Sequence, residues 1–138
     1  HSDIQAKSMT TVLIVEDDMQ LGRLYGKTLK SSGFAITLTV NCEQTFAILE
    51  TMTPDAILLD ITLPNGNGLD VIRYLRQNAR FAHTRILVLS GANHYEAHAQ
   101  EQGVDYFLHK PVSTRMLPDL LNRLFAEAHA TGTHAAVS

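Results

Sequence analysis

The chain has 138 residues, of which 45% are hydrophobic and 18% are charged, and its net charge is −3. This length accommodates one domain with a single core. Lysine and arginine form no block, so the charge pattern argues against binding nucleic acid or an anionic membrane without specificity. No apolar run reaches the roughly 20 residues that span a bilayer. The single cysteine, Cys42, excludes an intramolecular disulfide, which is consistent with a reducing cytoplasm.

Both ends of the chain are expected to lie outside the domain. Residues 1–8 precede Met9, and we interpret them as a vector leader. Residues 130–138 are small and polar without any period, which predicts a flexible tail or the start of a linker. The domain is therefore expected to span residues 9–129.

Five short apolar runs predict β-strands, and they alternate along the chain with helical patterns. The first, third and fourth runs are continuously apolar, as expected for strands buried on both faces of a parallel sheet. The predicted strands are Val12–Val15, Ala35–Thr39, Ala56–Leu59, Ile86–Leu89 and Tyr106–Leu108.

Apolar residues at helical spacing predict helices after these strands. Asn41 and Gln44 form the pattern of a capping box at the start of the second helix. Ser113 is the expected N-cap of the last helix. The apolar stripes are Leu21–Leu29 in the first helix, Ile72–Leu75 in the third and Leu117–Phe125 in the last.

The segment Asn93–Gln102 has a helical composition but no large aliphatic residue. We expect it to form a fourth helix that is weakly anchored and exchanges its amide hydrogens faster than the last helix does. Gly33 and Gly103 stand where the residue after a helix often adopts a positive φ, so each is expected to end a helix.

Strands that alternate with helices predict βαβ units, and hence an α/β fold with a doubly wound, five-stranded parallel sheet flanked by five helices. Right-handed crossovers leave few ways to wind such a sheet. Ligands of these sheets bind at the carboxyl ends of the strands. The residues that follow each predicted strand are therefore the first candidates for a functional site.

Polar residues follow four of the five predicted strands: Glu16-Asp17-Asp18, Asp60, Ser90 and Lys110-Pro111. If the carboxylates converge, at least one would be protonated unless a cation lies among them. A hard divalent ion with oxygen ligands relieves this repulsion, and Mg²⁺ is the usual ion where a phosphate joins the site.

Each of these residues also has an ordinary structural explanation. Glu16-Asp17-Asp18 could be acids favoured at a helix N-terminus, Asp60 could cap a turn, and Lys110 could be a solvated surface residue. The histidines have no shared metal-ligand spacing. His94 and His98 lie four apart, but no third zinc ligand accompanies them, and we interpret both as surface residues.

Taken together, the strand-end residues resemble those of the response-regulator receiver family of two-component systems, from Met9 to about Ala128. In the second of the four motifs, Asp60 is followed by Pro64 and Gly68 at family spacing, and the Lys110-Pro111 pair is nearly as specific. The motifs are VLIVEDD at 12–18, AILLDITLPNGNGLDVI at 56–72, ILVLSGA at 86–92 and GVDYFLHKPVS at 103–113.

The resemblance implies a flavodoxin-like sheet of order 2-1-3-4-5 and a role for each matching residue. Asp60 would accept a phosphoryl group, and Lys110 and Ser90 would engage its oxygens. Mg²⁺ would be held by Glu16, Asp17, Asp60 and the backbone carbonyl of Thr62, with Asp17 a direct ligand and Glu16 acting through water.

Ser90 and Phe107 would form the conformational switch of such a domain. The chain departs from the commoner family pattern here, with Ser in place of Thr at 90 and Phe in place of Tyr at 107. Pro64, Gly68 and Pro111 would be structural, and the bond between Lys110 and Pro111 is expected to be cis.

The implied function is a Mg²⁺-dependent phosphoacceptor in the cytoplasm that catalyses its own phosphotransfer and autodephosphorylation. Its partners would be a sensor histidine kinase or phosphotransfer protein and an output domain or effector, with a homodimer through the face of the fourth helix. Neither membrane insertion nor direct binding of nucleic acid is expected. The alternative is a degenerate receiver that acts only in protein docking, although Asp60, Asp17 and Lys110 are all intact.

Two other α/β classes fit the residues less well. Aspartyl-nucleophile phosphatases carry a second Asp two residues after the nucleophile, where this chain has Thr62. A flavodoxin-like electron carrier would need a hydroxyl- and glycine-rich phosphate loop after the first strand, where this chain has the anionic sequence EDDMQ.

Overall fold

The computed structural model describes residues 9–63, 66–91 and 103–130. The predicted strands are confirmed, four of them with one or two additional residues. The strands are β1 (Thr11–Val15), β2 (Ala35–Thr39), β3 (Ala56–Asp60), β4 (Arg85–Ser90) and β5 (Tyr106–His109). The helices are α1 (Met19–Ser31), α2 (Cys42–Leu49), α3 (Gly68–Gln77), the 3₁₀ helix η2 (Ala79–Phe81) and α5 (Met116–Ala130). The predicted fourth helix lies outside the described residues.

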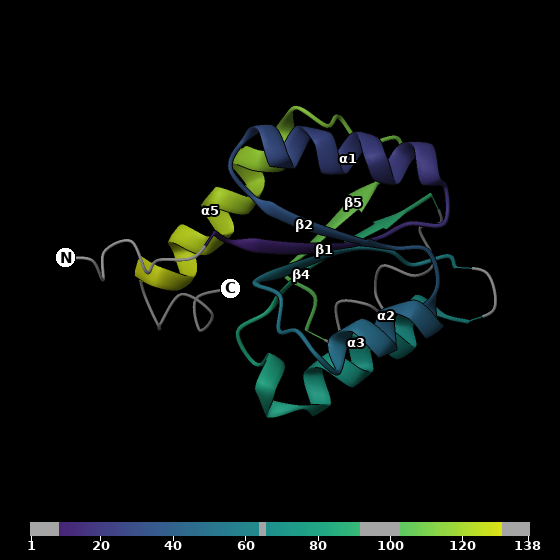
Figure 1. Cartoon of the computed structure of the whole chain (residues 1–138). Helices are drawn as coiled ribbons and strands as arrows, with labels where there is room; N and C mark the ends of the chain where they lie inside the picture. The colour runs from purple at the N-terminus through teal and green to yellow at the C-terminus, as the bar shows by residue number, and fades with distance from the viewer. Residues whose placement is uncertain (1–8, 64–65, 92–102, 131–138) are drawn as a thin grey trace.

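The strands form one parallel sheet in the order β2-β1-β3-β4-β5, so the predicted fold class is confirmed (Figure 1). Asp60 at the end of β3 is aligned with Leu89 of β4, and Ser90 is aligned with His109 of β5. Since all five strands run the same way, the residues that follow them meet at one edge of the sheet.

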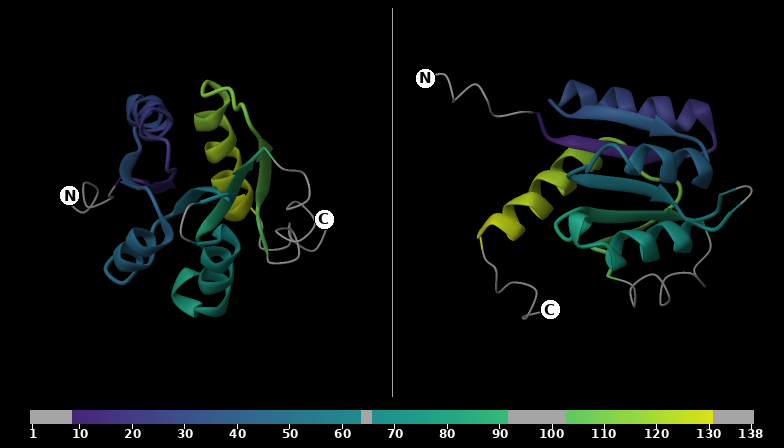
Figure 2. Two further views of the ribbon diagram at one scale, coloured as in Figure 1. Left: turned by 90° about the vertical axis from the view of Figure 1, so that its right-hand side faces the viewer. Right: turned by 60° about the horizontal axis from the view of Figure 1, so that its bottom comes forward.

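Helices cover both faces of the sheet, with α1 and α5 on one face and α2 and α3 on the other (Figure 1 and Figure 2). The side chains of β1 alternate between the two layers. Val12 and Ile14 pack with the α1 and α5 residues, whereas Leu13 and Val15 pack with those of α2 and α3. A strand covered on both sides needs apolar residues at every position, which explains its continuous apolar run.

Side-chain caps start the first two helices. Asp18 accepts hydrogen bonds from the first turn of α1, from the backbone N–H groups of Gln20 at 3.0 Å and Leu21 at 3.2 Å. Asn41 accepts from the Gln44 N–H at 2.8 Å, and the Gln44 side chain accepts from the backbone next to Asn41 at 3.0 Å. Asn41 is thus confirmed as the N-cap of α2, but the Gln44 side chain bonds to the N–H of Val40 and not to that of Asn41, so the reciprocal bond of a capping box is shifted by one residue.

Gly33 ends α1, as predicted, with a φ of 97°. Its N–H donates to the carbonyl of Lys30 at 3.0 Å, and the next N–H, that of Phe34, donates to Leu29 at 3.1 Å. This pair of bonds is a Schellman motif, and Phe34 and Leu29 are both buried in the same cluster. Gly103 also has a positive φ, of 86°.

The predicted N-cap of the last helix is wrong. Residues 114 and 115 form a turn, and α5 begins only at Met116. Ser113 supports this turn with its backbone carbonyl, which accepts from the Met116 N–H at 3.2 Å. The apolar stripe of the helix is as predicted, since Leu117, Leu120, Leu121 and Leu124 are buried.

Arg76, which no sequence pattern singled out, ties α3 to the strands β4 and β5. Asp105, just before β5, pairs with Arg76 at 3.2 Å and with Arg85 at 2.7 Å, and accepts from the Ile86 N–H at 2.7 Å. The guanidinium of Arg76 also donates to three backbone carbonyls, those of Gly103 at 3.0 Å, Phe81 at 3.2 Å and Thr84 at 2.9 Å.

None of the described helices is both long and apolar enough to cross a membrane.

Candidate functional site

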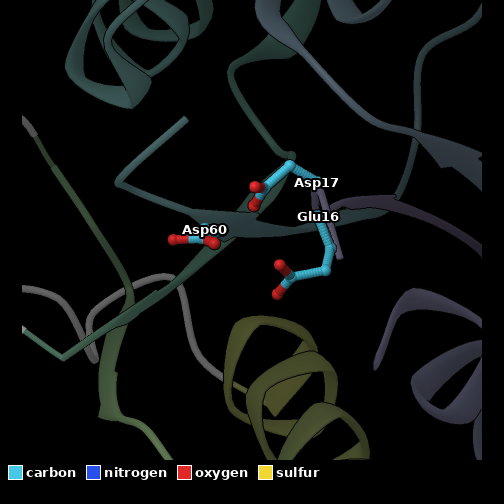
Figure 3. A group of neighbouring side chains, drawn as sticks. All are labelled: Glu16, Asp17 and Asp60. Carbon is cyan, nitrogen blue, oxygen red and sulfur yellow. The ribbon is translucent and has the colours of Figure 1, made fainter. Parts of the chain in front are cut away.

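Three acids meet at the carboxyl edge of the sheet. Glu16 and Asp17 follow β1, and Asp60 ends the neighbouring strand β3. One carboxylate oxygen from each of the three lies within 4.8 Å of the others, and Figure 3 shows the Asp17 carboxylate directed toward Asp60. Glu16 and Asp60 are only 2% and 4% exposed, whereas Asp17 is open to solvent. The predicted acid cluster is therefore assembled.

Asp18 has a different place from its two neighbours. Asp18 caps the N-terminus of α1. A place at a helix N-terminus was the ordinary structural explanation for Glu16, Asp17 and Asp18, and it holds for Asp18. The chain bends at Asp17 between β1 and α1, and the one acidic run supplies both the cluster and the helix cap.

Lys110 brings a positive charge to this cluster from the end of β5. Its ammonium Nζ lies 3.0 Å from Asp60 Oδ2 and 3.1 Å from Glu16 Oε1. Burial by itself lowers the pKa of Lys110, but its contacts with Asp60 and Glu16 outweigh burial, so the net pKa is raised. Lys110 is therefore an ammonium at neutral pH. The peptide bond between Lys110 and Pro111 is cis, as predicted.

Glu16 is the acid whose ionisation the site perturbs most. Burial and the nearby charge of Asp60 raise its pKa to about 7, although the hydrogen bond from the Asp18 N–H and the positive charge of Lys110 act in the opposite direction. Its Oε2 accepts the Asp18 N–H at 3.1 Å, but its buried Oε1 faces Lys110 without a well-aligned hydrogen bond. A buried Glu16 oxygen without a hydrogen-bond partner, beside two further carboxylates, suits a divalent cation that prefers oxygen ligands.

The two oxygens of Asp60 have different partners. Oδ2 accepts from Lys110, and Oδ1 accepts from the backbone N–H of Thr62 at 3.0 Å. The Thr62 amide thus orients the carboxylate, a contribution that the sequence did not indicate. The metal-binding role of the Thr62 carbonyl stays a prediction.

Gly68 supports the loop that follows Asp60. A Cβ atom at this position would lie 2.8 Å from both the Cα and the carbonyl oxygen of Ile61. That carbonyl accepts the Gly68 N–H at 3.2 Å. Only a residue without a side chain allows this approach, which is the physical reason for the glycine. Pro64 lies outside the described residues.

The two predicted switch residues lie on β4 and β5. Ser90 ends β4 fully buried, and its carbonyl accepts the Lys110 N–H at 3.0 Å. Phe107 is half-buried and packs against the cluster under α2 and α3. Its ring meets His109 edge-on, with 5.3 Å between the ring centroids. The strand positions are as expected, and the switching role stays a prediction.

Cys42 is a buried neighbour of the loop between β3 and α3 that the sequence did not connect with the site. Its Sγ donates to the Asn67 carbonyl at 3.6 Å. Burial raises the pKa of the thiol, and the charge of Asp70 raises it further. Sequence patterns carry no sign of this contact because the two residues lie 25 positions apart.

Comparison with known proteins gives the family. Residues 12–122 match the family model described as the response regulator receiver domain. The chain belongs to this family. Among curated relatives, the probable transcriptional regulatory protein SilR of Salmonella typhimurium is 34% identical over 72% of the chain, and the phosphate regulon transcriptional regulatory protein PhoB of Pseudomonas aeruginosa is 30% identical over 88%. The chain spans about half the length of these relatives, 44% of SilR and 53% of PhoB.

Solved receiver structures have the same fold. A signal receiver domain from Bermanella marisrubri is 31% identical, with a TM-score of 0.75 over 86% of this chain and 99% of that one. A CheY-like receiver domain from Methanospirillum hungatei has a TM-score of 0.83 over 91% of this chain and 100% of that one. At 20% identity, the second likeness concerns the fold alone.

Proposed function

We propose that this receiver domain accepts a phosphoryl group on Asp60 from a histidine kinase or a phosphotransfer protein of a two-component system. The observation that carries the proposal is the position of Asp60. It is a buried carboxylate at a strand end, 3.0 Å from the Lys110 ammonium and beside two further acids. A purely structural aspartate has no need of this combination at the ligand-binding edge of a parallel sheet.

In the proposed reaction, a carboxylate oxygen of Asp60 forms a bond to phosphorus. The phosphorus–nitrogen bond of a phosphohistidine donor breaks, and the imidazole leaves with the bonding electrons and takes up a proton. Lys110 lies where it can neutralise charge on the transferred oxygens. Water later hydrolyses the acyl phosphate, which makes the modification temporary.

Mg²⁺ is the cofactor we propose, held by Glu16, Asp17, Asp60 and the Thr62 carbonyl. When bound, it would reduce the repulsion between the Asp60 carboxylate and an anionic donor. Asp17 is exposed and Glu16 is engaged by Lys110, which supports Asp17 as the direct ligand. Asp17→Asn should therefore weaken Mg²⁺ binding more than Glu16→Gln in a calorimetric titration. Equal losses would contradict this division of roles.

The signalling step would be a shift between two conformations of the same fold. New charge on Asp60 would draw the Ser90 hydroxyl inward and let the Phe107 ring change its packing. An output domain or effector protein would read the change, and a homodimer through the face of the fourth helix could contribute. We assign the domain to the cytoplasm, where histidine kinases phosphorylate their receivers, and assign it no direct contact with nucleic acid.

The decisive experiment is phosphorylation with a small donor. Incubation of the chain with Mg²⁺ and acetyl phosphate should add one phosphoryl group, measured by intact-protein mass spectrometry. Asp60→Asn should abolish the addition, whereas Asp70→Asn, at an exposed aspartate paired with Arg73 on α3, should leave it unchanged. Undiminished labelling of the Asp60→Asn variant would refute the assignment.

A further inference from the structure

The strand β2 forms an open edge of the sheet. Among the described residues it pairs with β1 alone. The Ala35 N–H donates to the Thr10 carbonyl at 2.9 Å, and the Thr39 carbonyl accepts the Glu16 N–H at 3.0 Å. Successive residues of a strand direct their hydrogen-bonding groups to opposite sides, so those of Ile36 and Leu38 point away from β1. This edge therefore offers two N–H and two carbonyl groups to an added strand.

A groove runs along this edge beneath α1. The helix comes close to β2 through two glycines, and a Cβ at Gly22 or Gly26 would meet Leu38 at 3.5 Å or Ile36 at 3.4 Å. One cavity of about 510 Å³ has Ile36 and Leu38 on its strand side. A second, of about 390 Å³, shares Arg23 and Leu38 with it. The two cavities therefore adjoin at Arg23 and Leu38.

The strand side of the groove is apolar, and the helix side is basic. Leu38 is 43% exposed, and it lies on the strand side of both cavities. Arg23, Lys27 and Lys30 are exposed and line the helix side at successive turns of α1. They form no ion pair with any residue in the described part of the chain. Within the described part of the chain, no residue covers the exposed Leu38 side chain and no acidic residue pairs with these three basic residues.

We propose that this edge binds an extended, acidic segment of a partner protein as an additional strand beside β2. The backbone of the segment would pair with Ile36 and Leu38, and its alternate side chains would enter the groove. Acidic residues among them would meet Arg23, Lys27 and Lys30. Pairing of β2 with β2 of a second copy is disfavoured, because a two-fold axis would bring two such basic rows together on the same face. The proposal does not depend on phosphorylation of Asp60.

The test uses the full chain and a synthetic peptide. The probe is a fluorescein-labelled octapeptide with blocked ends, in which threonine occupies every second position and the positions between them are alternately valine and glutamate, so that one face of the strand carries both. Binding is measured by fluorescence anisotropy. Two control peptides separate the contributions. One replaces every glutamate with lysine. The other carries an N-methyl group on every backbone amide, which prevents strand pairing along both edges of the peptide without changing its charge.

Two protein variants test the two halves of the site. Lys27→Glu with Lys30→Glu reverses the charge and should weaken probe binding roughly tenfold, since an exposed ion pair contributes a factor of up to about five and reversal makes it repulsive. Leu38→Pro removes an N–H that points outward and makes no bond to β1, so the fold is retained while binding is lost. Arg115→Glu with Arg123→Glu reverses two charges at exposed positions before and on α5. This double variant is the matched charge control and should bind as the unaltered chain does.

The proposal requires that the valine–glutamate peptide binds, that both control peptides fail, and that amide chemical shifts of Ile36 and Leu38 change on binding. Absence of binding overturns it. So does equal binding of the lysine or N-methylated peptide, or retention of full affinity in either groove variant. Concentration-dependent dimerisation that Leu38→Pro abolishes would assign the edge to a second copy instead and would also overturn it.

Discussion

Gly68→Ala should destabilise the domain and disturb its acceptor site at the same time. The added Cβ would lie 2.8 Å from the Cα and the carbonyl oxygen of Ile61, and 3.1 Å from its carbonyl carbon. These are backbone atoms, so no side-chain rotation can relieve the contact. Ile61 directly follows Asp60, and the loop that holds the acceptor carboxylate must therefore move.

The size of the effect follows from this crowding. Overpacking that forces a backbone shift costs roughly 1–3 kcal/mol, and the higher helix propensity of alanine returns at most about 1 kcal/mol. For a domain of this size, each 1 kcal/mol changes Tm by roughly 4 °C. A net loss of about 1–2 kcal/mol therefore predicts a fall in Tm of roughly 4–8 °C.

Thermal unfolding followed by circular dichroism measures this fall, with Gly22→Ala as the matched control. A Cβ at Gly22 would meet Leu38 at 3.5 Å and Glu16 at 3.7 Å, which are ordinary contacts. That substitution lies inside α1 and should raise Tm by a few degrees, about 1 kcal/mol of helix propensity. Titration with Mg²⁺ well below Tm should show weaker binding for Gly68→Ala.

The reasoning fails if Gly68→Ala melts at or above the temperature of the unaltered chain. It also fails if Gly68→Ala and Gly22→Ala are destabilised equally, since the close contacts with Ile61 would then not explain the loss of stability. Lower stability with unchanged Mg²⁺ affinity would mean that the loop absorbs the shift without moving Asp60.

Two further predictions concern residues outside the acid cluster. Arg76→Ala leaves three backbone carbonyls without their guanidinium partner and leaves Asp105 paired with Arg85 alone, and should lower the free energy of unfolding in urea by about 3 kcal/mol. Arg73→Ala, which removes an exposed ion pair, should cost under about 1 kcal/mol, and similar losses for the two variants would contradict the prediction. Because burial raises the pKa of the Cys42 thiol, the reactive thiolate is scarce in the folded chain. Alkylation by iodoacetamide, followed by mass spectrometry, should be slow at neutral pH and fast in urea, and equal rates would show that Cys42 is accessible.

Local patterns in the sequence were sufficient for the architecture. The continuous apolar run of β1 marks a strand that is covered on both faces, and the Asn41–Gln44 pair marks the start of α2. Such signals depend on neighbours within one or two turns of chain, and so they can be read without the fold. Because parallel strands end at one edge, they also placed Glu16, Asp17 and Asp60 at a common site before any distance was known. The finer roles of these residues came from resemblance to the receiver family.

Only the tertiary structure decided how the site and its supports are joined. Lys110 reaches Asp60 across 50 residues, and Arg76 reaches Asp105 across 29. The contact of Gly68 with Ile61 and the start of α5 beyond Ser113 also depend on backbone paths that propensities do not describe. The open edge of β2 is a property of strand order. The physical reason is the same in each case. The spacing of apolar residues along the sequence indicates which face of a helix or strand is buried, whereas a long-range contact depends on how complete helices and strands pack together.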